Sequence, residues 1–552
     1  MFDKLKTSDT PRRTLALLLA LTTALGPTAV PAFAASKPAT KPTGKAAPTS
    51  TPVQHLVVIF GENISFDHYF GTYPSATNPA GEPKFKASPD TPTINGLSGA
   101  LLTTNPNLNP ANGTGASNPF RLDRSQAYTA DQDHDYTPEQ QAYDFGLMDL
   151  FPLNTGTAGP PPSGSGVTQT NGLVMGYFDG NTVTALWNYA QNFSMNDNSF
   201  SSTFGPSTVG VINLVSGQTN GVTDILNGTG DEVNGGPDGS LTVIGDPNPL
   251  GDVCTSSSSN QVTMGSKTIG DLLTSAGVTW GGFMGGFNLS TINPNGTTGC
   301  NRSTTSAVTG VTESDYIPHH SFFNYWTSTG NPAHTRPASL SEIGNAGPAN
   351  HQYDIEDFYA AAAGGYLPAV SFLKAPGYQD AHAGYSDPLD EQAFVVNTIN
   401  LLEALPTWSS TAVVVLYDDS DGWYDHQMGP IVNTSTGPDD ALTGSGACGT
   451  ALTSLPGLNT TGDPHALGRC GYGPRQPLLV ISPYARQNFV DHTVTDQTSV
   501  IHFIEDNWLG GQRIGQGSFD GVANSIAQMF NFTKIRTNGT LFLNPSTGEI
   551  EK

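Results

Sequence analysis

Short runs of apolar residues along the chain alternate with segments in which apolar residues recur at helical spacing. Residues 56–60 (LVVIF) and 413–416 (VVVL) contain no polar residue, a pattern typical of strands buried on both faces of a parallel sheet. Further strands are predicted at residues 277–283, 369–373 and 478–482. Helices are predicted at residues 137–146, 181–192, 353–363, 389–405, 497–508 and 522–530.

This alternation predicts the α/β fold class, with a central, mostly parallel sheet between helical layers. Four segments rich in Gly, Asn, Thr and Pro interrupt it: residues 85–119, 154–170, 219–266 and 434–463. We expect them to be long loop insertions. Because no linker or repeat divides residues 53–552, we predict a single domain there.

The N-terminal residues have the pattern of a secretory signal peptide. Four basic residues precede an apolar run at residues 15–25, and Ala-Phe-Ala at residues 32–34 resembles a cleavage site. We therefore predict a signal peptide at residues 1–34 and a disordered linker at residues 35–52. No other run is apolar enough to span a membrane, so we expect an exported protein, periplasmic or secreted. The export route, Sec or twin-arginine, stays open.

The exported chain would be strongly acidic. The whole sequence has 22 Lys and Arg against 47 Asp and Glu. Residues 1–34 contain four of the basic residues and two of the acidic ones. Removing these leaves 18 basic and 45 acidic residues, a net charge of −27. Because nucleic acids are polyanions, this balance argues against nucleic-acid binding.

Four cysteines are an even number in a chain that we expect to be exported, so disulfides are expected. Three pairings are possible, and pairing between near neighbours favours Cys254–Cys300 and Cys448–Cys470. Metal binding by these residues is less favoured, because no short C-x-x-C spacing is present.

Oxygen-bearing side chains follow two of the apolar runs. Glu62 and Asn63 come after residues 56–60, and Asp418, Asp419 and Asp421 come after residues 413–416. In open α/β sheets, ligands bind at the carboxyl ends of strands. Neighbouring strands would therefore bring these groups together as a hard-cation site. The alternative is a solvated Asp/Gly turn at the end of a strand.

A serine and several histidines add candidate chemistry. Ser207 follows a Gly-Pro turn and opens a segment of helical length at residues 208–216. It is either a nucleophile beside free backbone N–H groups or a serine that caps the helix. His134, the His319-His320 pair and His382 stand among polar residues. They are either donors to a phosphate, active below neutral pH when protonated, or structural histidines.

Five ordered stretches resemble the bacterial acid phosphatase and phospholipase C family, which is related to the alkaline phosphatase superfamily. The resemblance runs from about residue 55 to residue 530. The stretches are ENISFDHYFGTYP (62–74), DQDHDYTPEQQAYDFGLMDLFP (131–152), FGPSTVGVINLVSG (204–217), HHSFFNYW (319–326) and VVLYDDSDGWYDH (414–426). The chain departs from the family at Ile64, where a polar residue is common, and this affects the expected substrate preference.

The resemblance implies an alkaline-phosphatase-like fold and a set of site residues. One divalent metal ion, Ca, Mg or Zn, would be held by Glu62, Asn63, Asp418 and Asp419 together with Ser207. Ser207 would be the nucleophile. His134, His320 and His382 would line the phosphate pocket, with His319 as the other member of the doublet.

We therefore expect a hydrolase of phosphate monoesters with broad specificity, an acid phosphatase that acts through a phosphoserine. The alternative is a phospholipase C that cleaves phospholipid headgroups. The protein would thus bind small phosphorylated substrates or phospholipid headgroups. Two other classes are a serine esterase and a non-catalytic, calcium-stabilised surface protein. The sequence around Ser207 lacks the G-x-S-x-G motif of a serine esterase. A non-catalytic surface protein would leave Ser207 and the histidines unexplained.

Overall fold

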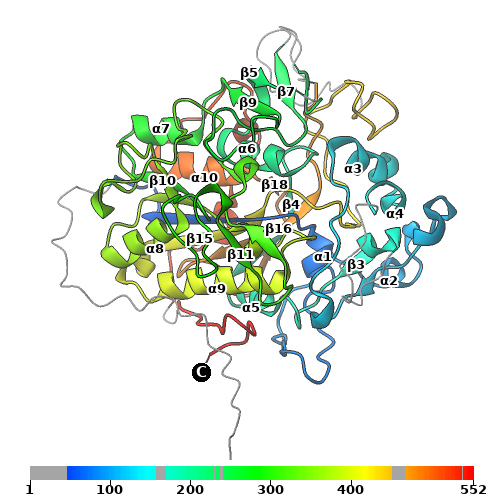
Figure 1. Ribbon diagram of the computed structural model, residues 1–552. Helices are drawn as coiled ribbons and strands as arrows, with labels where there is room; N and C mark the ends of the chain where they lie inside the picture. Colours follow the sequence, from blue (N-terminus) through cyan, green and yellow to red (C-terminus); the bar gives the residue numbers. More distant parts are fainter. Residues whose placement is uncertain are drawn as a thin grey trace, which may run out of the picture. The chain divides into compact units, whose positions relative to one another are not determined.

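A nine-stranded sheet forms the centre of the computed structural model (Figure 1), which describes residues 47–156, 170–228, 230–235, 240–449, 467–536 and 539–551. All of these lie within one compact unit, Pro42–Lys552. The predicted signal peptide and residues 35–46 of the predicted linker lie outside the described residues. So do parts of the predicted insertions at 154–170, 219–266 and 434–463.

The strands of the large sheet follow the order β13-β10-β14-β1-β15-β16-β4-β17, and β18 also pairs with β4. Every pairing is parallel except the two that β16 makes with β15 and β4. The predicted α/β class with a mostly parallel sheet is thus confirmed. The strands are β1 (His55–Gly61), β4 (Ser194–Phe200), β10 (Trp280–Met284), β13 (Gln352–Asp354), β14 (Val370–Lys374), β15 (Thr411–Tyr417), β16 (Arg475–Ile481), β17 (Phe489–Asp491) and β18 (Thr495–Asp496).

Helices cover both faces of this sheet. In Figure 1, α6 (Ser207–Ser216), α7 (Ile269–Ser275) and α10 (Thr498–Trp508) lie above it. Below it lie α5 (Thr184–Asn192), α8 (Ile355–Gly364) and α9 (Pro388–Glu403). The remaining helices are α1 (Phe66–Phe70), α2 (Ala100–Thr103), α3 (Tyr136–Tyr143) and α4 (Phe151–Asn154).

The helix predicted at residues 522–530 is wrong. Only Ile526–Met529 is helical there, as a short 3-10 turn. The Ser525 hydroxyl accepts from the Ala527 N–H, and the Asn524 amide donates to the Val494 carbonyl. Side chains of this kind hydrogen-bond the backbone locally and compete with a longer helix.

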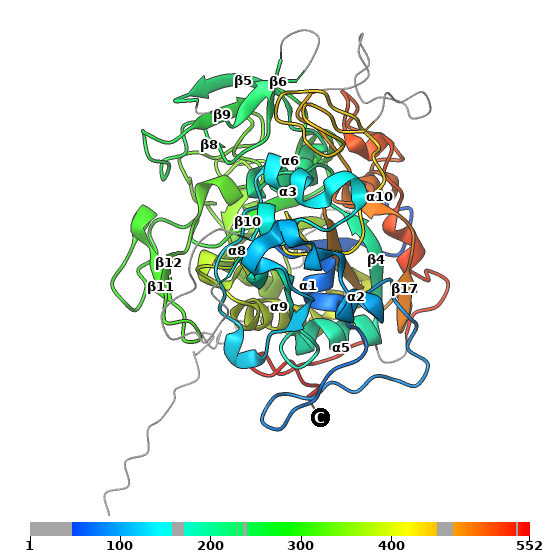
Figure 2. The same cartoon turned by 90° about the vertical axis from the view of Figure 1, so that its right-hand side faces the viewer.

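A second sheet replaces the loop predicted at residues 219–266. It has five strands in the order β6-β7-β5-β9-β8 and lies next to α6 in Figure 2. Gly and Asn between its short strands hide the alternation that would have revealed it. Its strands are β5 (Asn220–Leu226), β6 (Glu232–Asn234), β7 (Leu241–Val243), β8 (Asn248–Pro249) and β9 (Gln261–Met264). Two short pairs are β2 (Phe120–Arg121) with β3 (Gly176–Tyr177), and β11 (Ser303–Thr305) with β12 (Thr312–Ser314).

Both predicted disulfides are present, Cys254–Cys300 and Cys448–Cys470. In the described part of the chain, no helix has the length and apolar character needed to cross a membrane.

The central strands bring the predicted site residues together. β1 lies between β14 and β15, with Gly61 level with Tyr417 and Ile59 level with Leu373. The three strands are parallel, so their carboxyl ends meet at one edge of the sheet. Residues that follow β1 and β15 therefore lie side by side, as the sequence predicts.

Candidate active site

Four predicted ligands converge where β1 and β15 end. Glu62 and Asn63 follow β1, and Asp418 and Asp419 follow β15; each is buried. The backbone N–H of Asn63 donates to Asp418 Oδ1 at 3.0 Å, which ties the two strand ends together. Asn63 has a φ of 61°. This left-handed conformation is uncommon for a residue with a side chain and is frequent at functional sites.

The oxygens of these side chains face one another. The Asn63 amide oxygen lies 2.7 Å from Glu62 Oε2, 3.2 Å from Asp418 Oδ1 and 3.3 Å from Asp419 Oδ2. Turning the amide over would replace these contacts with N–H donors and let His382 Nε2 donate to its oxygen at 3.0 Å. The first orientation suits a cation, because the amide oxygen then joins carboxylate oxygens of Glu62, Asp418 and Asp419 that lie within 4.8 Å of one another.

Burial makes these carboxylates costly to ionise without a positive partner. It raises the pKa of Glu62 well above its usual value, and the Asp418 carboxylate adds to the rise. Burial likewise raises the pKa of Asp419. A divalent cation would offset this cost, so the residues present fit a metal ion.

Ser207 is the first residue of α6, and its hydroxyl points into the oxygen cluster. Its Oγ lies 3.0 Å from Glu62 Oε2 and 3.1 Å from Asp419 Oδ2, so its one proton can be donated to either carboxylate. Pro206 holds the N-cap position, so Ser207 lies inside the helix and does not cap it. The capping interpretation of Ser207 is therefore wrong, and its hydroxyl contacts the candidate metal ligands.

Gly210 allows α6 to approach the end of β15. A Cβ atom at this position would lie 2.4 Å from the Asp418 carbonyl oxygen and 2.7 Å from its C and Cα atoms. Because residues three apart share one face of a helix, this contact also positions Ser207. The N–H of Thr208 donates to Asp246 Oδ1 at 2.8 Å. That donor of the helix N-terminus is thus occupied, contrary to the expectation of free N–H groups.

Lys374 is a site residue that the sequence analysis missed. Its Nζ contacts Glu62 Oε1 and lies 3.0 Å from Asp418 Oδ2, and all three side chains are fully buried. Burial alone would lower the pKa of Lys374, but the two carboxylates more than offset it and raise the pKa. The available signal was a single charge at the end of the apolar segment 370–374, next to β1 in the sheet.

All four predicted histidines gather around this cluster. His320 Nδ1 lies 3.2 Å from Glu62 Oε1, and the His319 ring lies 4.5 Å from the His320 ring. His134 and His382 face each other with ring centroids 5.8 Å apart. Their Nδ1 atoms contact the carbonyls of Gln132 at 2.8 Å and Ala383 at 2.6 Å. Each Nδ1 therefore carries the proton, and each Nε2 can donate only when its ring is protonated.

The histidines differ in how readily they hold that proton. Burial would lower the pKa of His134, but Asp419, Asp421 and Asp131 more than offset it and raise the pKa well above the usual value. Burial lowers the pKa of His320 and of His382. Without phosphate, only His134 of these three is favoured as a cation near neutral pH.

Other histidines of the sequence have structural contacts. His55 contacts the Pro368 carbonyl at 2.8 Å, and His351 contacts the Trp280 carbonyl at 2.9 Å. His334 Nε2 lies 3.1 Å from Asp252. His465 lies outside the described residues.

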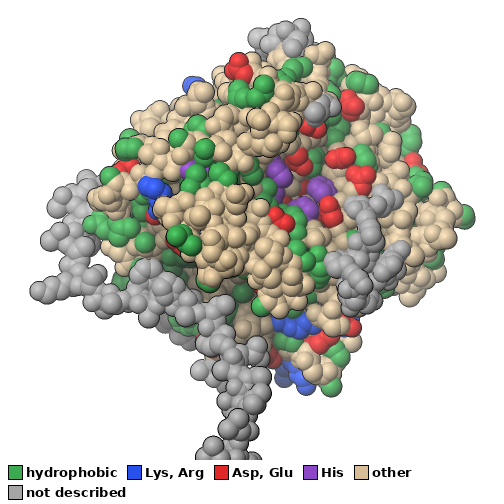
Figure 3. All heavy atoms as spheres, in the orientation of Figure 1, with side chains coloured by type: hydrophobic (Ala, Val, Ile, Leu, Met, Phe, Trp, Pro, Cys, Tyr) green, Lys and Arg blue, Asp and Glu red, His purple; other side chains and the backbone are tan. Residues whose placement is uncertain are grey.

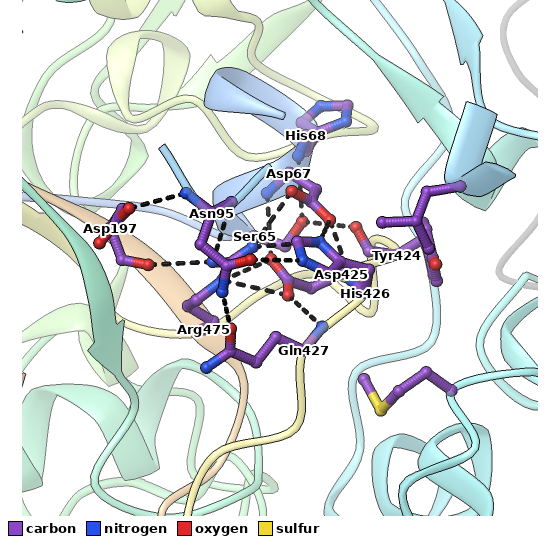
Figure 4. A network of polar contacts seen from close by, with 12 residues as sticks. Ser65, Asp67, His68, Asn95, Asp197, Tyr424, Asp425, His426, Gln427 and Arg475 are labelled. Carbon is purple, nitrogen blue, oxygen red and sulfur yellow. Dashed lines mark hydrogen bonds and ion pairs between the residues drawn. The ribbon is translucent and has the colours of Figure 1, made fainter. Parts of the chain in front are cut away.

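A buried network behind the site joins the two motifs that supply the ligands (Figure 4). Asp67 follows Asn63 by four residues, and its Oδ2 accepts from His426 Nδ1 at 2.6 Å. Arg475, at the start of β16, donates to Asp67 Oδ1 and to both Asp425 carboxylate oxygens at 3.1 Å. We call Asp67, Asp425, His426 and Arg475 the brace. It fixes the loop that leaves β15 against α1.

A cavity of about 630 Å³ opens beside the site, and His319, His320 and His382 lie in its wall. In Figure 3, histidine side chains are visible in a hollow near the centre of the face, with acidic side chains beside them. A substrate can therefore reach the histidines from solvent.

Comparisons with known proteins give this arrangement a context. A model described as the Phosphoesterase family matches residues 53–509. "Phospholipase C B" of Mycobacterium tuberculosis is 23% identical over 466 residues, which are 82% of this chain and 73% of that protein. "Non-hemolytic phospholipase C" of Pseudomonas aeruginosa is 35% identical over 144 residues, 26% of this chain. The chain spans only 20% of the length of that relative.

Among solved structures, a protein in the alkaline phosphatase superfamily from Vibrio parahaemolyticus matches with a TM-score of 0.26 and 14% sequence identity. The match covers 60% of this chain and 62% of that one.

Proposed function

The chain belongs to the phosphoesterase family, and from this premise we propose that it hydrolyses phosphate esters with Ser207 as the nucleophile. The observation that carries the proposal is the direction of the Ser207 hydroxyl. It lies within hydrogen-bond distance of Glu62 and Asp419 inside a buried oxygen cluster instead of capping its own helix. A serine esterase would not need four oxygen ligands around its nucleophile.

The metal ion would be held by Glu62, Asn63, Asp418 and Asp419, together with Ser207. A bound divalent cation would supply positive charge that lowers the pKa of the Ser207 hydroxyl and neutralises phosphoryl oxygens. An all-oxygen ligand set favours a hard cation such as Ca²⁺ or Mg²⁺, whereas a nearby histidine would admit Zn²⁺.

In the proposed reaction, Ser207 Oγ attacks phosphorus while its proton passes to a carboxylate oxygen of Glu62 or Asp419. The bond between phosphorus and the alcohol oxygen breaks on the opposite side. His134, whose imidazolium is favoured here, supplies the proton that the leaving oxygen needs. Water then cleaves the phosphoserine, which releases phosphate and restores the Ser207 hydroxyl.

Protonated His320 and His382 would donate to the remaining phosphoryl oxygens. Because burial lowers the pKa of both, this donation strengthens as the pH falls or once an anionic phosphate is bound. The proposed activity is therefore that of an acid phosphatase.

Small phosphate monoesters are the proposed substrates, with broad specificity. The wall of the cavity beside the histidines includes Ser, Thr and carboxylate side chains, and these polar groups favour a polar alcohol. A phospholipase C is the second candidate, and the names of the two relatives favour it. We also propose that the protein is exported, which the two disulfides and the N-terminal pattern support.

Phosphate release from p-nitrophenyl phosphate and diacylglycerol release from phosphatidylcholine, each with and without a chelator, test the activity. The proposal expects chelator-sensitive phosphate release that Ser207→Ala lowers by at least about 10³-fold. Mass spectrometry after an acid quench should find a phosphoryl group on the peptide that contains Ser207. Near-normal activity of Ser207→Ala would overturn the assignment, and turnover of phosphatidylcholine alone would favour the second candidate.

A further inference from the structure

The cavity beside the site has walls outside the proposed catalytic groups. His319, His320 and His382 belong to one part of its wall, next to Glu62 and Asn63. The rest comes from residues 254–259 beside the Cys254–Cys300 disulfide, from β12 and residues 316–318, from residues 383–385, and from Asp131 and Asn248. An ester that places its phosphoryl group at Ser207 would extend its alcohol into this space.

The charged side chains in the walls, histidines aside, are both acidic. They are Asp131 and Glu313, and none of the described residues that line the cavity is Lys or Arg. Lys374 does not line the cavity; it is fully buried and paired with Glu62 and Asp418. Apart from the histidines, which the phosphoryl group would engage, the cavity offers no cationic partner to an anionic group on the alcohol.

Two aromatic rings complete the walls. The Tyr316 hydroxyl donates to Asp252 at 2.6 Å, and the Tyr385 hydroxyl donates to Asp380 at 3.0 Å. Because both hydroxyls are already engaged, the rings contribute mainly aromatic surface, which attracts cations. The Tyr385 ring also stacks on His382 with centroids 4.4 Å apart, so it lies directly beside the proposed phosphate contact.

Glu313 carries the charge of this wall without contacting a proposed catalytic group. It lies on β12, and its Oε1 accepts from the Ser314 N–H at 2.7 Å. Its field reaches the cavity wall at Tyr385: burial raises the pKa of Tyr385, and the Glu313 carboxylate adds to the rise. A change of charge at Glu313 thus alters the field in the cavity and leaves the site behind it intact.

We propose that this cavity is a leaving-group subsite that favours cationic and uncharged alcohols and disfavours anionic ones, with Glu313 as a specificity-determining residue. This inference rests on the proposed function. A negative charge on the alcohol would meet Asp131 and Glu313 in a space partly shielded from water, where screening by salt is weaker than at the surface. A quaternary or primary amine would meet the same carboxylates and two aromatic rings.

The test compares kcat/KM for three small monoesters: O-phosphoethanolamine, glycerol 2-phosphate and 3-phosphoglycerate. Their alcohols are cationic, uncharged and anionic in that order. The proposal expects kcat/KM to fall along this series at low salt, by on the order of tenfold between the extremes. It also expects 0.5 M NaCl to narrow the difference, although only in part.

Variants at Glu313 separate this effect from other causes of preference. Glu313→Lys should raise the ratio of 3-phosphoglycerate to O-phosphoethanolamine turnover by about tenfold, and Glu313→Gln by less. Hydrolysis of glycerol 2-phosphate should not change. Glu551→Lys, a charge reversal at an exposed position that does not line the cavity, should leave all three rates unchanged.

Equal kcat/KM values for the three esters, or an unchanged ratio in a folded Glu313→Gln or Glu313→Lys, would overturn the inference and leave the proposed function standing. If none of the three esters is hydrolysed, the proposed function itself fails.

Discussion

Gly210→Ala should separate the position of Ser207 from its chemistry. The added methyl group would lie 2.4 Å from the Asp418 carbonyl oxygen and 2.7 Å from two further backbone atoms. Ordinary contacts of this kind are about 3.5–4 Å, so α6 and the end of β15 must separate by roughly 1 Å. No side chain can move aside to avoid this, because all three atoms belong to the backbone.

The cost follows from that displacement. Moving Ser207 by about 1 Å relative to Glu62 and Asp419 should lower kcat by about 10²-fold. Overpacking costs about 1–3 kcal/mol, and roughly 1 kcal/mol returns because Ala favours a helix more than Gly does. The free energy of unfolding should therefore fall by only about 0–2 kcal/mol.

Steady-state kinetics with p-nitrophenyl phosphate and thermal unfolding measure the two effects on the same sample. Gly521→Ala is the matched control, because no atom lies within 4 Å of a Cβ built there. The control should keep its activity and its melting temperature. A Gly210→Ala enzyme with wild-type kcat would refute the reasoning, since Ser207 would then tolerate the displacement.

Three further predictions concern charge at buried positions. Burial raises the pKa of Glu391 from 4.5 to about 7, so the folded protein keeps a proton that the unfolded chain loses. The free energy of unfolding should fall by about 3 kcal/mol as the pH rises from about 4.5 to about 7. In urea unfolding, Glu391→Gln should make the free energy of unfolding depend less on pH in this range. Lys374→Met leaves Glu62 and Asp418 without their partner and should destabilise the fold by about 3–5 kcal/mol. Added divalent cation should recover part of the lost melting temperature, and equal losses with and without cation would contradict this. Dialysis against a chelator should abolish phosphate release, and divalent cations should restore it; activity that survives complete metal removal, checked by elemental analysis, would exclude the metal.

The sequence was most informative where local pattern and chemistry coincide. The apolar runs before Glu62 and before Asp418 identify two strands, and the polar residues at their ends identify the site. Both statements need only a few neighbouring residues. The 3.6-residue spacing likewise revealed α5, α8, α9 and α10 to within a few residues.

Structural features that depend on residues distant in the sequence were not predicted. β4 has the polar sequence SMNDNSF, yet most of it is buried. Its Ser194 and Asn196 side chains donate to backbone carbonyls that lie 292 to 335 positions further along the chain. The direction of β16 cannot be read from its apolar residues. It starts at the edge where β15 ends and is therefore antiparallel. Lys374 became a site residue only once the register placed β14 beside β1.

The brace makes the candidate site a property of the completed chain. Asp67 lies close to the beginning of the folded part, Asp425 and His426 follow some 360 residues later, and Arg475 later still. During synthesis, a ribosome has to pass residue 475 before the loop carrying Asp418 and Asp419 can be locked against α1. Shorter nascent chains would therefore carry all of the proposed ligands and yet be inactive. The proposed activity would therefore wait for β16, which is made after every proposed ligand.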